Sequence, residues 1–138
     1  MRAKSLAQSF YQYPLSLTQF IFSMFDFENL EVYQKAKAFN KTVYQFLQKN
    51  QKIDQTTRHQ LRRASFSIML NIAEGSSRFS KADRRNFYVI ARGSVFECVA
   101  IFEFMQEENL METDLYNNLY QNSEEISKMI YAMIKNLS

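Results

Sequence analysis

The chain has 138 residues, of which 46% are hydrophobic, so it is long enough to bury one core but too short for two domains. Two glycines and one proline are too few for the turns of a sheet-rich fold, which favours helices. A single cysteine, Cys98, excludes an internal disulfide, and no apolar stretch approaches the ~20 residues of a membrane-spanning helix. We therefore expect a cytoplasmic protein without a membrane span.

Charge is distributed unevenly along the chain, although its formal total is only +3. Residues 58–96 contain eight basic side chains against two acidic ones, whereas residues 97–138 contain eight acidic side chains against two basic ones. This asymmetry indicates either a nucleic-acid footprint on the basic part or attraction between neighbouring copies of the chain.

The first residues of the chain differ in character from the rest. Residues 1–23 contain aromatic and apolar side chains without a sustained period, and Pro14 interrupts any long helix. Three explanations compete: a start codon assigned upstream of the native one, a segment that docks on a neighbouring subunit, and a weak targeting sequence. We favour the first, and expect residues 1–25 to be a leader outside the fold and residues 26–138 to form one domain.

Apolar residues recur at steps of three and four through four stretches, which predicts four amphipathic helices. These run from Leu30 to about Asn50, from Asp54 or Thr56 to about Ser76 with Gly75 as the stop, from Ser80 to about Gln106, and from Thr113 to about Leu137. Long helices with short connections predict an all-α fold, an antiparallel up-down four-helix bundle.

The expected core faces follow from the helical wheel at 100° per residue. The second helix should turn Leu61, Ser65, Ile68 and Ile72 inward, with Phe66, Met69, Leu70 and Ala73 on a second apolar face. The third should bury Phe87, Ile90, Ala91, Ser94, Cys98, Ile101, Phe102 and Met105. Its outer side still carries Phe96, Val99 and Phe104, which would be exposed in a monomer, so these three are our candidates for an oligomer interface.

Arginine dominates the basic part of the chain, and guanidinium groups match the geometry of phosphates. The candidate nucleic-acid-binding residues are Arg58, Arg62, Arg63, Arg78, Lys81, Arg84, Arg85 and Arg92. A competing interpretation places part of them in a polar network that fixes helix or subunit packing, since half-buried polar groups need partners. That network would comprise Arg63, Ser67, Asn71, Glu74, Arg78 and Glu97.

No combination of residues suggests catalysis. His59 is the only histidine and cannot build a metal site alone, and Cys98 reads as a small core residue. Glu97 and Glu103, six residues apart, point about 120° away from each other on a helix and make a poor acid–base pair. We expect no enzyme, no bound metal and no cofactor.

Several runs of the chain closely resemble a family of four-helix-bundle proteins encoded in intervening sequences of bacterial 23S ribosomal RNA genes. They are Leu30 to Ala36, Gln60 to Ser65, Ser67 with Ile68, Asn71 to Gly75, Arg78, and Ala91 to Ser94 with Glu97. The resemblance, over about residues 26–137, implies a left-handed up-down bundle, ring-like homo-oligomers that are often pentamers, and no catalytic activity. A related branch is the accessory protein of diversity-generating retroelements, which implies nucleic acid and a reverse transcriptase, or a ribosome-related complex, as partners.

Two classes of function remain open. In the first, a non-enzymatic oligomer presents its arginine-rich surface to RNA or DNA and acts as a scaffold. In the second, the protein is a purely structural or protein-interaction homo-oligomer, and the basic part of one copy meets the acidic last helix of the next. Salt-dependent binding to nucleic acid separates the two classes.

Overall fold

The computed structural model describes residues 25–137. Four helices dominate it: α3 (Glu31–Lys49), α4 (Gln55–Ser77), α5 (Lys81–Glu107) and α6 (Thr113–Asn136), preceded by the short 3-10 helix η1 (Asp26–Asn29). Within this described part there is no strand. The all-α class is confirmed, and each predicted helix lies within one or two residues of its expected bounds.

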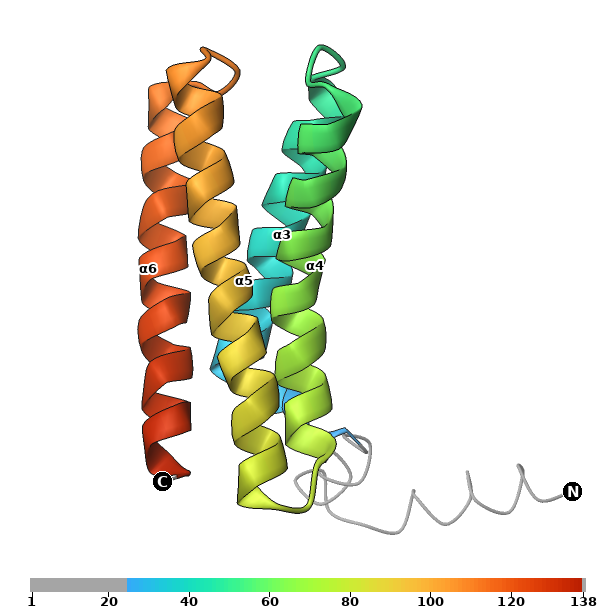
Figure 1. Ribbon diagram of the computed structural model, residues 1–138, viewed down its shortest axis with the longest axis vertical. Coiled ribbons are helices and arrows are strands. Elements are labelled where there is room, and N and C mark those ends of the chain that lie inside the picture. Colours follow the sequence, from blue (N-terminus) through green and yellow to red (C-terminus); the bar gives the residue numbers. More distant parts are fainter. Residues whose placement is uncertain (1–24, 138) are drawn as a thin grey trace, which may run out of the picture.

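The helices follow one another up and down along the same long axis (Figure 1). Each packs against its neighbour in the sequence, and α3 also packs against α6, which closes the bundle. An ion pair of 2.9 Å between Lys35 Nζ and Glu125 Oε1 joins α3 to α6, and it raises the pKa of the Lys35 ammonium. The left-handed turn of the bundle stays a prediction.

Local hydrogen bonds explain where the helices begin and end. The Asp54 carboxylate accepts from the Thr57 backbone N–H at 2.9 Å and from its hydroxyl at 2.6 Å, which begins α4 and lowers the pKa of Asp54. Ser80 accepts from the Asp83 N–H at 3.1 Å and begins α5, as predicted. Asn109 has a positive φ of 57°, which Asn tolerates better than most residues, and it turns the chain after α5.

Gly75 does not end α4, contrary to the prediction. The helix continues to Ser77, and Gly75 is buried in it without a positive φ. A Cβ at this position would lie 2.7 Å from Cε1 of Tyr88 and 3.0 Å from Cβ of Phe87. The glycine therefore allows α4 and α5 to approach closely.

The core forms along the length of the four helices. The predicted inward residues of α4 are all buried. On α3 the buried residues are Val32, Ala36, Phe39, Val43, Phe46 and Leu47, and Phe39 meets Phe102 of α5 edge-on with ring centroids 5.9 Å apart. On the second apolar face of α4, Phe66 and Leu70 are exposed, whereas Met69 and Ala73 are half-buried. Met69 packs against the core, so the described chain covers this face only in part.

The buried face of α5 is rotated from the predicted one by roughly 40° on the helical wheel. Ile90, predicted to face inward, is 51% exposed, and Phe87 is only half-buried. Tyr88 and Val95 are buried in their place. Tyr88 is buried because Gly75 has no side chain, so that the Tyr88 ring occupies the space against α4 that a larger residue would fill.

Within residues 25–137, no helix is both long and apolar enough to span a bilayer. The leader expected at residues 1–25 lies, except for its last residue, outside the described part of the chain. The part that follows it packs on the bundle: η1 contacts α3 and α4, and the Phe27 and Tyr33 rings lie 4.8 Å apart.

Candidate nucleic-acid and self-association surfaces

The eight basic candidate residues do not form one patch. Arg58, Arg62 and Arg63 lie toward the end of the bundle that holds the α3–α4 connection, whereas Arg78, Lys81, Arg84 and Arg85 surround the α4–α5 connection at the opposite end (Figure 1). At 1.5 Å per residue, the two groups are roughly 27 Å apart along α4. Arg92 lies farther along α5.

The Arg58 side chain is held by two hydrogen bonds to backbone carbonyls. Its guanidinium donates to the carbonyl oxygens of Leu47 and Asn50, both at 2.6 Å. These carbonyls are at the end of α3, where helices have unsatisfied acceptors and favour positive charge. Arg58 therefore stabilises the α3–α4 connection, and these two bonds leave few of its N–H donors for a phosphate.

Arg62 and Arg92 stack on aromatic rings. The Arg62 guanidinium carbon lies 4.5 Å from the centre of the Tyr44 ring of α3, and that of Arg92 lies 4.7 Å from the centre of the Phe96 ring, one turn along α5. Such stacking suits a guanidinium and restrains it without neutralising its charge. Arg63 is exposed, with no hydrogen bond or ion pair in the described chain.

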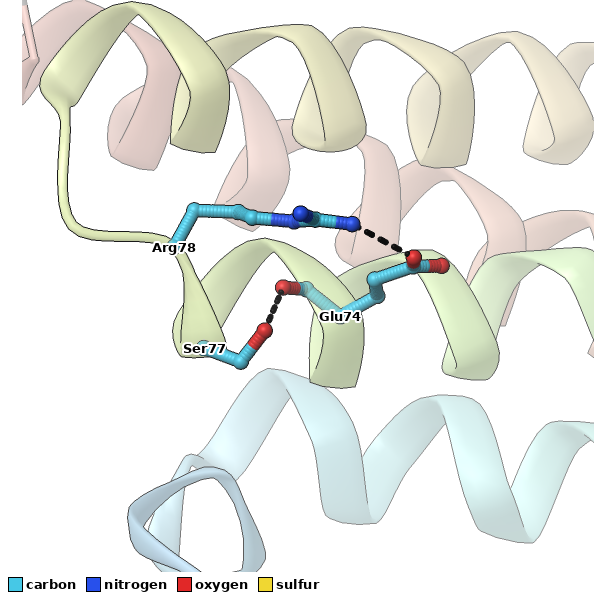
Figure 2. A network of polar contacts seen from close by, with 3 residues as sticks. All are labelled: Glu74, Ser77 and Arg78. Carbon is cyan, nitrogen blue, oxygen red and sulfur yellow. Dashed lines mark hydrogen bonds and ion pairs between the residues drawn. The ribbon is translucent and has the colours of Figure 1, made fainter.

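At the α4–α5 end, two arginines are fixed by local bonds. Figure 2 shows Arg78 Nη2 bound to the Glu74 carboxylate at 2.8 Å and the Ser77 hydroxyl donating to the Glu74 carbonyl at 2.6 Å. Arg78 also lies over the Phe87 ring at 4.7 Å. Arg84 Nε donates to the Arg78 carbonyl at 2.6 Å and so holds the connection closed.

The same end also presents unengaged groups. Lys81 and Arg85 are exposed, and no hydrogen bond or ion pair of the described chain occupies either of them. Between Arg78 and Ser80, the Phe79 ring is fully exposed. Sequence reasoning missed Phe79 because it belongs to no helix face. The one signal that could have indicated Phe79 is its position, because it is a large apolar residue in a connection of three residues.

The predicted polar network is present in part and has a different centre. Asn71 Nδ2 donates to the Ser67 hydroxyl at 2.9 Å, and Ser94 donates to the same hydroxyl at 2.8 Å, which joins α4 to α5. Glu74 and Arg78 form a separate pair. Arg63 and Glu97 make no such bond in residues 25–137, and Ser94 was not predicted as a member.

The three interface candidates lie on the outer side of α5. Phe96 is 55% and Phe104 is 47% exposed, while Val99 is half-buried. Phe96 and Val99 line a largely apolar groove between α5 and α6, together with Tyr120 of α6. Val89 and Ile90 extend the exposed apolar surface toward the start of α5.

The described residues hold no group of three or more His, Cys, Asp or Glu side chains arranged for a metal ion. Cys98 is buried in the core, and burial raises the pKa of its thiol far above the ordinary value. A protonated, enclosed thiol is a poor nucleophile and a poor metal ligand.

Comparison with known proteins adds a family. A comparison with curated proteins found no match. A solved structure from Bacteroides thetaiotaomicron, described as a protein of unknown function from the S23 ribosomal protein family, is 28% identical, with a TM-score of 0.70 over 75% of this chain and 98% of that chain. The family model described as 23S rRNA-intervening sequence protein matches residues 28–132. The chain thus belongs to the 23S rRNA-intervening sequence protein family.

Proposed function

We propose that this protein is a homo-oligomeric scaffold without catalytic activity of its own, and that it binds RNA through the α4–α5 end of the bundle. The observation that carries the proposal is the combination at this end of two exposed, unengaged cations with a fully exposed aromatic ring. Lys81 and Arg85 supply the charges, and Phe79 supplies the ring.

Each part of this end suits a different part of an RNA strand. Phosphates attract free cations in a way that does not depend on sequence, whereas aromatic rings stack on bases that are not paired. Arg78 and Arg84 keep the connection in place, so the three contacting side chains extend from a fixed turn. The expected ligand is therefore a single-stranded segment or loop of RNA.

RNA binding can be tested with a charge-matched pair of double variants. Lys81→Ala with Arg85→Ala should weaken binding to a labelled RNA and reduce the slope of log affinity against log salt by about 0.7 for each phosphate that the protein no longer neutralises. Lys37→Ala with Lys41→Ala removes the same charge from exposed positions of α3 and should have little effect. Equal weakening by both doubles, or no binding by the native chain, would contradict the proposal.

Phe79 offers a direct optical test, because the chain contains no tryptophan. In a Phe79→Trp variant, stacking on a base should quench the fluorescence of the single indole when an unstructured oligonucleotide is added. A duplex of the same length should quench it less, since its bases are already stacked. Retained binding without quenching would remove Phe79 from the site while leaving the charged side chains in it.

A second candidate function is a purely structural homo-oligomer. The exposed apolar face of α5 favours it, as do the intramolecular contacts that already engage Arg58, Arg62 and Arg92. Light scattering at micromolar concentration should then give an oligomer, with the pentamer implied by the family resemblance as the first expectation. Phe96→Glu or Val99→Glu should split it, and the protein would ignore RNA at moderate salt.

A further inference from the structure

Gly93 is an unexplained residue near the middle of α5. Glycine in a helix interior lowers the folding equilibrium constant by about threefold to fivefold relative to alanine. A helical glycine is usually explained by a positive φ or by lack of space for a Cβ. The second reason holds at Gly75, whose Cβ would collide with Tyr88.

Neither reason holds for Gly93 within the described chain. Its φ is not positive, the residue is exposed, and a Cβ built on it would meet nothing within 4 Å. Substitution by alanine should therefore favour the isolated bundle. The glycine becomes understandable if its backbone is approached by something other than residues 25–137 of the same copy.

The surroundings of Gly93 indicate what kind of surface approaches. One turn before it, Val89 and Ile90 are 50% and 51% exposed, and one turn after it Phe96 is 55% exposed. Residues three and four apart are neighbours on a helix, so the glycine is a gap between large apolar side chains. An apolar helix surface with a gap of this kind fits another helix packed closely across it.

The charges along α5 indicate which chain supplies the helix that packs on it. Before Gly93 the exposed charges of α5 are Lys81, Asp83 and Arg85, which are of mixed sign, and after it they are Glu97, Glu103 and Glu107, which are all acidic. A partner along the second half of α5 must therefore offer basic groups. Another copy of the chain offers such groups, because its residues 58–96 are strongly basic.

We propose that a helix of a second copy of this chain crosses α5 at Gly93, with its backbone closest where the side chain is missing. The inference rests on the self-association proposed above and adds its contact point. Val89, Ile90 and Phe96 then pack around the crossing helix, and the acidic second half of α5 favours a basic segment of the second copy.

This geometry predicts that Gly93→Ala stabilises the folded bundle and weakens the assembly, and the test measures both effects. In the full chain, Gly93→Ala should raise the denaturation midpoint, measured by circular dichroism at a concentration where the assembly has dissociated, and it should raise the dissociation constant of the assembly. Gly93→Leu should raise that constant further, by about tenfold or more, since it fills the crossing point. Sedimentation velocity over a dilution series measures the dissociation constants.

Gln48→Leu is the matched control, because Gln48 is exposed on α3, which packs against α4 and α6. It should leave the dissociation constant unchanged. If Gly93→Leu assembles as well as the native chain or better, the Gly93 contact is wrong while self-association stands. If the native chain is a monomer at micromolar concentration, both the contact and the proposed oligomer are wrong.

Discussion

The Arg58→Ala variant should lose stability and keep its affinity for RNA. The guanidinium makes two bonds of 2.6 Å to the Leu47 and Asn50 carbonyls at the end of α3. Bonds from a charged donor contribute about 1.5–3 kcal/mol each, and the two share one guanidinium, so we expect a loss of about 2–4 kcal/mol in the free energy of unfolding. For a domain of this size, that corresponds to a fall of roughly 8–16 °C in the melting temperature.

Urea unfolding followed by circular dichroism measures the loss, and Arg63→Ala provides the control. Arg63 lies on the same helix, is exposed and makes no hydrogen bond or ion pair in the described chain, so its removal should change stability by less than about 0.5 kcal/mol. RNA affinity of both variants should be compared under conditions where each is folded. Equal stability of the two variants, or a selective loss of RNA binding in Arg58→Ala, would refute the structural role assigned to Arg58.

Three further predictions concern packing and protonation. Gly75→Ala should destabilise the protein by about 1–2 kcal/mol, because the cost of overpacking against Tyr88 exceeds the gain in helix propensity; a gain in urea midpoint would contradict this. Cys98 should react with a thiol reagent only on unfolding, since it is buried and its thiol pKa is raised, and rapid labelling of the native chain would show that the core opens. The pKa of the Asp54 carboxyl is lower in the folded than in the unfolded chain, because the carboxylate accepts hydrogen bonds from Thr57. The stability that this helix cap contributes is therefore complete above the unfolded pKa of about 4 and is lost as the pH falls through the folded pKa. Asp54→Asn should remove this part of the acid sensitivity of the urea midpoint.

Helix positions could be predicted from the sequence because local signals agree with the tertiary packing. The capping pattern of Ser80 and Asp83 and the regular apolar steps of α3 need no knowledge of distant residues. The errors arose where a distant residue decides. Gly75 reads locally as a stop, and only the Tyr88 ring shows why a glycine stands inside the helix.

The candidate site was harder to predict for a related reason. The sequence identifies eight basic residues between positions 58 and 96, yet their availability depends on carbonyls and rings brought near by the fold. The bonds of Arg58 to Leu47 and Asn50 span a connection whose geometry the sequence does not specify. Phe79 carries no periodic signal, and its exposure follows from the short turn between two helices.

The order of the helices around the bundle has a consequence for folding kinetics. Since each helix packs on the one next to it in sequence, most tertiary contacts join residues close along the chain, and such topologies fold in microseconds to milliseconds. The α3–α6 contact joins the first and last of the four helices, so its loop-closure entropy is the largest. We expect this seam, with the Lys35–Glu125 pair, to form last during folding and to open first in native-state hydrogen exchange.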